Sequence, residues 1–269
     1  MHERQLDIET KDGRTTTFIV HPDRGGPHPI ILFYMDAPAI REELRDMARR
    51  FATSGYYVML PNLYYREGVM ELGPLPMDPN APERKRMFAL MESLTIAKIM
   101  DDTDALLAFA AKDPAASKGK VGAVGYCMSG QYAINAAAPI PDRVAAAASI
   151  YGVRLITDKH DSPHTVAHKA KGELYFACAE RDHWVPLEQI EPLKQALKDA
   201  NTKAEVEIYE DTDHGFAFPS RPIYKKQAAE RHWERLLALF KRTLGYRSHT
   251  YSSWPGLTRP PSGRASARP

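Results

Sequence analysis

The chain has 269 residues, of which 43% are hydrophobic, so it can bury one large core and we expect a single main domain. Lysine and arginine number 36 against 34 acidic residues, but four arginines lie beyond Gly245, so residues 1–245 carry a net charge of −2. This balance argues against a nucleic-acid partner. The charged N-terminus and the lack of a long apolar run argue against a signal peptide and a membrane partner, and predict a cytoplasmic protein.

Short strand-like runs alternate with helical periods along most of the chain, which predicts an α/β fold with a mostly parallel sheet covered by helices on both faces. The beginning differs, because residues 4–9 and 14–20 alternate and are joined by Lys11-Asp12-Gly13, which predicts an antiparallel hairpin at the N-terminal edge. Further strands are predicted at 30–34, 56–60, 120–124, 143–149, 173–178 and 204–209. Helices are predicted at 40–51, 86–112, 130–138, 187–200 and 222–243.

Two segments lack an apolar period. Residues 62–84 hold two glycines and four prolines, which predicts a long loop of the functional or mobile kind. From Tyr246 the chain is rich in Ser, Pro and Arg, which predicts a disordered tail over 246–269 after a domain that spans 1–245.

The segment Gly125-Tyr126-Cys127-Met128-Ser129-Gly130 follows a predicted strand and precedes a predicted helix. Small residues two before and two after a nucleophile are typical of the nucleophile elbow, a sharp turn that lifts the side chain at its apex above the sheet. The helix N-terminus would stabilise a thiolate at Cys127. Taken alone, the pattern is equally compatible with a small buried cysteine.

Elbow enzymes present their triad in the order nucleophile, acid, base, and two later residues fit this order. Asp182 follows the predicted strand 173–178, and His214 follows the predicted strand 204–209. Both would therefore lie at the carboxyl edge of the sheet, where open α/β sheets keep their ligands. The alternatives are a helix N-cap for Asp182 and a surface histidine for His214. The shared order favours a Cys127-His214-Asp182 triad.

With these motifs in place, the sequence resembles the dienelactone hydrolase family, over about residues 3 to 245. The matching segments are Gly125 to Gly130, Asp182 to Pro186, Asp213 to Phe216 and Pro61 to Arg66. The resemblance implies the α/β-hydrolase fold, a carboxylic ester or lactone as substrate, and no metal or other cofactor.

The resemblance also implies further site residues. An acidic residue after the first central strand contacts the resting nucleophile in the family, and Asp36 occupies that position, with a local loop contact as the alternative. The backbone amides of Met128 and Ala37 would form the oxyanion hole. Substrate contacts are expected from Arg66, Tyr126, Trp184, Phe218 and Arg221.

Three positions depart from the family pattern. Family members often carry Glu at the position of Asp36, and often glycine where Ser129 stands. The family's second carboxylate-binding arginine, four residues after the catalytic histidine, is replaced by Phe218, and Arg221 is the nearest substitute. Arginine holds a carboxylate by paired hydrogen bonds, so this clamp would need to be rebuilt.

The predicted reaction is attack of Cys127 on an ester carbonyl, followed by hydrolysis of the thioester by water that His214 activates. The same triad could serve a thioesterase or acyltransferase. A different class of function is a non-catalytic redox or ligand-sensing module built around Cys127, although no resolving cysteine lies near in sequence. The expected partner is a small-molecule ester or lactone, and the expected assembly is a monomer or homodimer.

Three histidines and the second cysteine need separate explanations. His160, His164 and His168 recur every four residues, which on a helix would line one face and could bind a metal. Pro163 and its neighbours break such a helix, so no metal site is expected. Cys178 lies in an apolar run and is interpreted as a core thiol.

Overall fold

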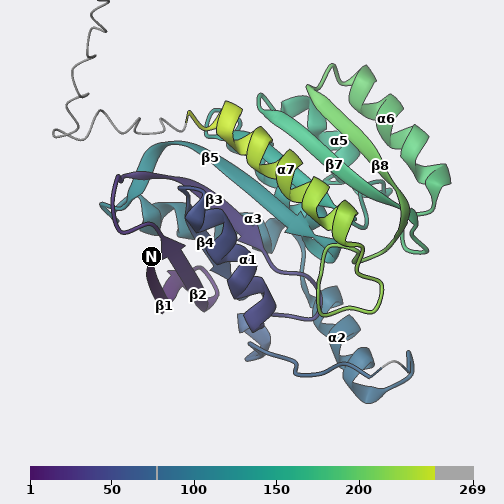
Figure 1. Cartoon of the computed structure of the whole chain (residues 1–269), viewed down its shortest axis with the longest axis horizontal. Coiled ribbons are helices and arrows are strands. Elements are labelled where there is room, and N and C mark those ends of the chain that lie inside the picture. The colour runs from purple at the N-terminus through teal and green to yellow at the C-terminus, as the bar shows by residue number, and fades with distance from the viewer. Residues whose placement is uncertain (77, 246–269) are drawn as a thin grey trace, which may run out of the picture.

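The structure is a computed structural model that describes residues 1–76 and 78–245; the predicted tail at 246–269 lies outside these residues. One eight-stranded sheet organises the described chain, with the order β1-β2-β4-β3-β5-β6-β7-β8 (Figure 1). Its strands are β1 (His2–Thr10), β2 (Gly13–His21), β3 (His28–Tyr34), β4 (Tyr57–Pro61), β5 (Ala116–Tyr126), β6 (Val144–Ile150), β7 (Glu173–Arg181) and β8 (Ala204–Asp213).

The sheet is parallel from β4 to β8 and antiparallel at its N-terminal edge, as predicted. β1 and β2 form a hairpin in which Thr10 pairs with Gly13. Gly13 has a φ of 138°, a backbone conformation that side chains disfavour, so the turn requires glycine at this position. The fold is the predicted α/β-hydrolase arrangement.

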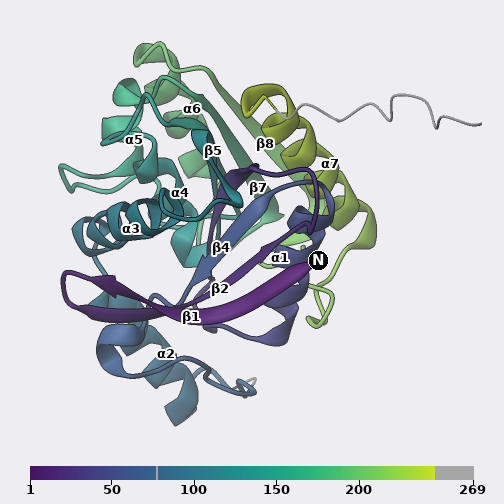
Figure 2. The ribbon, with the colours of Figure 1, turned by 90° about the vertical axis from the view of Figure 1, so that its left-hand side faces the viewer.

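Helices cover both faces of the sheet. The main helices are α1 (Glu42–Thr53), α2 (Pro82–Ser93), α3 (Ile96–Ala110), α4 (Gly130–Ala136), α5 (Pro163–Val166), α6 (Ile190–Asp199) and α7 (Lys226–Thr243). Four single turns are η1 (Tyr65–Glu67), η2 (Cys127–Ser129), η3 (Ala167–Lys169) and η4 (Leu187–Gln189). α1 and α7 lie on one face, and α3, α4, α5 and α6 lie on the other (Figure 2).

The region predicted as one helix over 86–112 is two helices. Leu94 has an extended backbone, with a ψ of 142°, and ends α2. The side chain of Thr95 then accepts a hydrogen bond from the amide of Lys98 at 3.2 Å and starts α3. A threonine N-cap inside the helical period therefore divides the segment. The predicted long loop is also shorter than expected, because α2 begins at Pro82.

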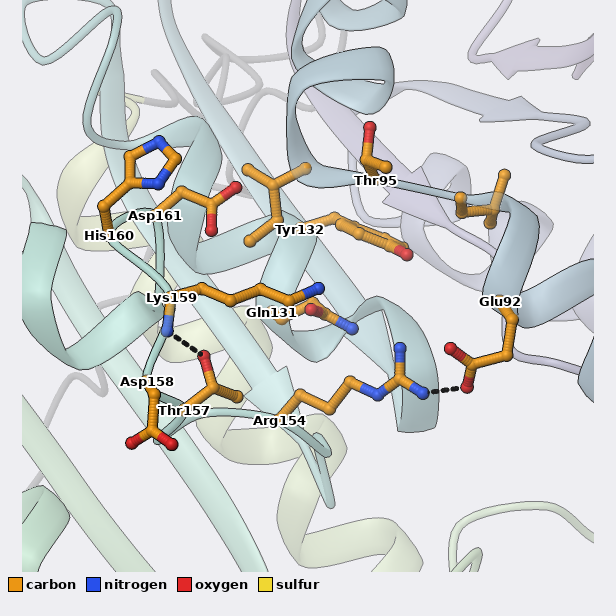
Figure 3. A pocket seen from close by; sticks show the side chains of 12 residues that line it. Glu92, Thr95, Gln131, Tyr132, Arg154, Thr157, Asp158, Lys159, His160 and Asp161 are labelled. Atoms are coloured by element: carbon orange, nitrogen blue, oxygen red, sulfur yellow. Dashed lines mark hydrogen bonds and ion pairs between the residues drawn. The ribbon is translucent and has the colours of Figure 1, made fainter.

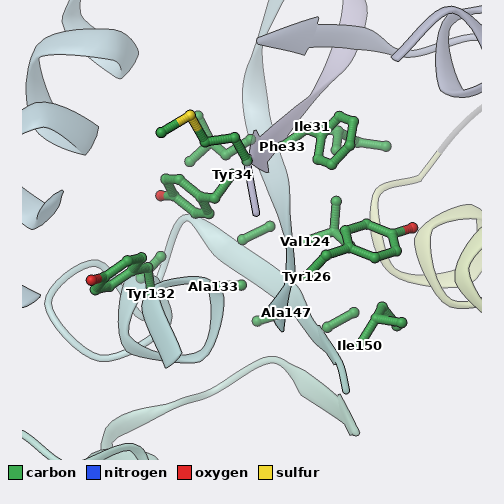
Figure 4. Packing of buried hydrophobic residues seen from close by; sticks show 14 of the residues in the cluster. Ile31, Phe33, Tyr34, Val124, Tyr126, Tyr132, Ala133, Ala147 and Ile150 are labelled. Carbon is green, nitrogen blue, oxygen red and sulfur yellow. The ribbon is translucent and has the colours of Figure 1, made fainter. Parts of the chain in front are cut away.

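The central strands are buried on both faces. Tyr34, Val124, Tyr126, Ala147 and Ile150 lie between the helical layers (Figure 4), with at most 1% of any of these side chains exposed. Such strands need apolar residues at consecutive positions rather than at alternate ones, as the runs in β3 and β6 have. The carboxyl ends of β3, β5, β6, β7 and β8 meet at one edge of this rigid sheet, and the predicted site residues follow them.

Candidate active site

Cys127 occupies the sharp turn between β5 and α4. Its φ is 55°, a left-handed conformation that is rare for a residue with a side chain. Strained backbone of this kind is held in place only by strong local packing and is concentrated at functional sites. The predicted elbow geometry is therefore present, and Cys127 is partly exposed rather than buried in the core.

The residues around Cys127 explain why this turn forms. A Cβ atom on Gly125 would collide with the carbonyl of Ser129, and one on Gly130 would collide with the hydroxyl of Ser149. Ser129 is buried, and its hydroxyl accepts a hydrogen bond from the Tyr126 amide at 3.0 Å and donates one to the Tyr34 carbonyl at 2.9 Å. Serine at the position where the family often has glycine thus ties the elbow to β3.

Asp182 and His214 form a hydrogen-bonded pair at the same sheet edge. Oδ2 of Asp182, which directly follows β7, lies 2.7 Å from Nδ1 of His214, which directly follows β8. Oδ1 of Asp182 accepts hydrogen bonds from the amides of Trp184 and Val185, at 2.9 and 3.3 Å. Oδ1 therefore fixes the carboxylate to its own loop, and Oδ2 orients the imidazole. His214 is not the surface histidine of the alternative reading, since 7% of its side chain is exposed.

The imidazole of His214 lies beside Cys127. Burial lowers the pKa of His214, but the negative charge of Cys127 and the hydrogen bond to Asp182 outweigh it and raise this pKa to about 10. Nε2, the ring nitrogen opposite Asp182, is buried and has no well-aligned hydrogen-bond partner among the described residues. This nitrogen is the one available to exchange a proton with the sulfur or with a water molecule.

Tyr151 is a candidate site residue that the sequence analysis did not identify. It follows β6 directly, has a φ of 37°, and its ring packs edge-on against His214 with centroids 5.1 Å apart. Its hydroxyl is buried and has no partner in the described part of the chain. The position one residue beyond a central strand was the signal that could have identified it.

Tyr64 connects the two residues predicted to form the oxyanion hole. Its buried hydroxyl donates a hydrogen bond to the carbonyl of Ala37 at 3.0 Å and lies 3.3 Å from the sulfur of Met128. Ala37 follows β3 and Met128 follows Cys127, so Tyr64 holds two separate loops against each other. The use of their amides as oxyanion donors stays a prediction.

Asp36 is completely buried and is paired with two arginines. Its carboxylate accepts hydrogen bonds from Arg41 at 2.5 and 3.2 Å and from Arg221 at 2.8 Å. The structure records no hydrogen bond from Asp36 to Cys127 among the residues it describes, so the contact implied by the resemblance stays a prediction. Like Tyr151, Arg41 lies near the candidate site and was not identified from the sequence.

The ring of Phe218 contacts the same two arginines. The guanidinium carbons of Arg41 and Arg221 lie 4.8 and 4.7 Å from the centroid of its ring. The ring is fully buried, and the expected contact of Phe218 with a substrate stays a prediction. The ring also supports Arg221, because an aromatic face attracts a guanidinium.

The other side chains that were expected to contact the substrate have different surroundings. Tyr126 is fully buried and its hydroxyl lies 3.0 Å from Nε2 of His232 on α7, and its expected substrate contact stays a prediction. Arg66 donates two hydrogen bonds of 2.9 Å to Asp102 and one of 2.8 Å to Asp12, so it joins the N-terminal hairpin to α3. Trp184 is 48% exposed and packs on Phe88 of α2, 5.8 Å between ring centroids, where substrate contact stays a prediction.

The remaining histidines are used locally. His164 hydrogen-bonds to Ser162 and His168 to the Thr165 carbonyl, at 2.8 and 2.9 Å, and α5 begins only at Pro163. Within residues 1–76 and 78–245, no three His, Cys, Asp or Glu side chains gather closely enough to hold a metal ion. Cys178 is buried, as a core thiol would be. Over the same residues, no helix has both the length and the apolar composition needed to cross a bilayer.

Comparison with known proteins agrees with this geometry. The model of the dienelactone hydrolase family matches residues 15–244. A protein of Escherichia coli (strain K12) with the provisional name carboxymethylenebutenolidase is 30% identical over 229 residues, covering 83% of this chain and 80% of the relative. The carboxymethylenebutenolidase of Pseudomonas putida is 29% identical over 236 residues, covering 86% and 93%.

A crystal structure from Klebsiella pneumoniae subsp. pneumoniae MGH 78578, provisionally described as a dienelactone hydrolase, has the same fold. It superposes with a TM-score of 0.80 at 24% identity, covering 90% of this chain and 98% of the other. The family match covers nearly the whole sheet and includes Cys127, Asp182 and His214. This chain therefore belongs to the dienelactone hydrolase family and is a carboxylic ester hydrolase.

Proposed function

We propose that the protein hydrolyses a carboxylic ester or lactone through a Cys127-His214-Asp182 triad and a thioester intermediate. The observation that carries the proposal is the placement of a strained Cys127 beside a histidine that Asp182 holds at 2.7 Å. This is the arrangement of nucleophile, base and orienting carboxylate that acyl transfer requires.

The proposed reaction has two halves. The sulfur of Cys127 bonds to the carbonyl carbon, the carbonyl electrons move to oxygen, and collapse of the adduct breaks the ester C–O bond. The leaving alcohol takes a proton from His214, and the acyl group remains on sulfur as a thioester. A water molecule then attacks the thioester and gives its proton to Nε2 of His214, and the sulfur leaves as a thiolate while the carboxylic acid is released.

Backbone amides would stabilise the negative oxygen formed in both halves. The amides of Met128 and Ala37 are the proposed donors, and one such donor typically lowers the barrier of acyl transfer by about 3 kcal/mol. The contact of the Tyr64 hydroxyl with both residues supports this assignment, because it limits how far the two loops can separate. Asp182 would keep the imidazole in the correct tautomer.

The test is ester turnover by single variants. Cys127→Ala and His214→Ala should each reduce hydrolysis of 4-nitrophenyl acetate by at least about 10³-fold, since the triad acts as a unit. Cys178→Ala is the matched control, because it removes the other thiol and should retain turnover. In the wild type, mass spectrometry of the quenched reaction should find an acetyl group on Cys127.

Two results would contradict the proposal. Full hydrolysis by Cys127→Ala would remove the sulfur from the reaction. Absence of turnover with every ester, lactone and thioester, combined with peroxide oxidation of Cys127, would favour the redox alternative. Faster turnover of thioesters than of esters, or transfer of the acyl group to an added alcohol, would keep the triad and assign the thioesterase or acyltransferase alternative. The predicted cytoplasmic location stays a prediction.

A further inference from the structure

A cavity with charged, polar and apolar lining residues lies beside the elbow, and the proposed chemistry does not use it. Its volume is about 650 Å³, within the range typical of small-molecule sites. The end of α2, the junction of α2 with α3, the start of α4 and the loop after β6 form its walls (Figure 3). Three segments that are distant in sequence, 92–96, 131–132 and 154–161, therefore line one space.

Two hydrogen bonds attach the walls of this cavity to the backbone of the elbow, one at Met128 and one at Cys127. Gln131, which lines the cavity, donates from Nε2 to the carbonyl of Met128 at 2.9 Å. Val153 donates its amide to the carbonyl of Cys127 at 3.1 Å, and the next residue, Arg154, lines the cavity. Arg154 also has a φ of 57°, so this wall contains strained backbone like the elbow itself.

Several polar groups in the cavity have no partner. Oδ1 of Asp161 is buried without a hydrogen bond to any described residue. The ammonium of Lys159 and the hydroxyl of Tyr132 likewise make none within the described chain. Figure 3 shows the Lys159 side chain extending toward Gln131, with the Asp161 carboxylate on the same side. An ionised carboxylate only accepts hydrogen bonds and an ammonium only donates them, so a ligand here must do both.

The charges of the cavity disfavour an anionic ligand. Arg154 is paired with Glu92, and the other charged lining residues are one base, Lys159, and two acids, Asp158 and Asp161, so acidic side chains outnumber basic ones in the lining. The side chains of Leu94 and Ile96 add an apolar wall. Hydroxyl groups both donate and accept, and a ring that carries them also has an apolar face. The lining therefore matches a neutral polyhydroxylated ring better than a carboxylate or phosphate.

We propose that this cavity binds a neutral polyhydroxylated group, such as a sugar ring, and that this group is part of the ester substrate. Its role in catalysis rests on the proposed function, whereas binding itself does not. Asp161 would accept hydrogen bonds from ligand hydroxyls and Lys159 would donate to them, so both are positioning residues for the substrate.

The kinetic test compares three acyl esters: 6-O-acetylglucose, ethyl acetate and monoethyl succinate. The wild type should prefer 6-O-acetylglucose to ethyl acetate by at least tenfold in kcat/KM. Asp161→Asn and Lys159→Met should each lower this preference about tenfold, mainly through KM. Lys159 is exposed, so Lys159→Met should leave the fold intact and still test the ester preference if Asp161→Asn weakens the fold. The matched control is Asp142→Asn, the same change at an exposed site before β6, which should keep the preference.

A binding test separates failure of the cavity from failure of the chemistry. Cys127→Ala protein should bind methyl glucoside saturably in ligand-observed NMR, and Cys127→Ala/Asp161→Asn should not. If no ester is turned over but this difference is seen, the proposed function fails and the cavity stands. Equal binding by both proteins, equal ester preference in Asp161→Asn and the wild type, or a wild-type preference for monoethyl succinate would overturn the cavity assignment.

Discussion

Arg221 donates a hydrogen bond of 2.8 Å from Nη2 to Oδ2 of Asp36, and this ion pair joins the loop after β8 to the loop after β3. The two loops carry His214 and Ala37, which belong to different parts of the proposed machinery. Asp36 is completely buried while both arginines that pair with it are about one quarter exposed. One buried carboxylate and two cations therefore hold these two loops together.

Replacing this carboxylate should destabilise the protein. Asp36→Asn leaves Arg221 partly buried without its counter-ion and leaves Arg41 with Glu43 alone, at 3.0 Å, so the free energy of unfolding should fall by about 2 kcal/mol, less than for a fully buried pair. Arg221→Met is the control, and it should cost less because Arg41 still neutralises Asp36. Urea unfolding measures both, and a larger loss for Arg221→Met would contradict this account.

Loss of the Tyr64 hydroxyl should slow catalysis without weakening substrate binding. Tyr64→Phe should lower kcat about tenfold with KM nearly unchanged, because oxyanion donors act mainly in the transition state. The lost hydrogen bond should cost about 1 kcal/mol of stability. Tyr65→Phe, which removes a hydroxyl bound to Asp102 at 2.8 Å, should cost similar stability and leave kcat intact. Equal kcat in the two variants would exclude the positioning role of Tyr64.

The hydroxyl of Tyr151 should matter for activity and not for stability. A buried hydroxyl without a partner costs about 1 kcal/mol or more, so Tyr151→Phe should unfold at equal or higher urea concentration than the wild type. If the hydroxyl hydrogen-bonds to the substrate, kcat/KM should fall about tenfold. Tyr209→Phe is the comparison, since its hydroxyl is paired with Tyr175 at 2.7 Å and its loss should destabilise the protein. A stable, fully active Tyr151→Phe would assign the hydroxyl no function.

The titration of His214 should depend on Cys127. Burial lowers its pKa, but the charge of Cys127 and the contact with Asp182 raise it to about 10, above the ordinary value of 6.5. The imidazolium therefore stabilises the fold fully below about pH 6.5, and this contribution is lost as the pH rises through about 10.

Nitrogen NMR of the imidazole should accordingly show His214 protonated at pH 8 in the wild type. In Cys127→Ala the strongest cause of the raised pKa is gone, so the proton should leave at clearly lower pH. Cys178→Ala should titrate like the wild type. An unchanged His214 titration in Cys127→Ala would show that the sulfur and the imidazole are not coupled.

Local sequence patterns were sufficient to predict much of the fold. Consecutive apolar residues in β3 and β6, and the glycine turn after Thr10, are local requirements of buried strands and of a tight hairpin, so they can be seen along the chain. The division at Leu94 was missed, because the helical period continues through it and only the side-chain bond of Thr95 marks the boundary.

The order of Cys127, Asp182 and His214 along the chain was sufficient to predict that all three follow strands at one edge of the parallel sheet, and the contact between Asp182 and His214 is found there. Which groups pair across that edge was decided only by tertiary packing. Three contacts depend on distances between loops that no local pattern encodes. They are the ion pair of Arg221 with Asp36, the packing of Phe218 against Arg221 and the ion pair of Arg66 with Asp102.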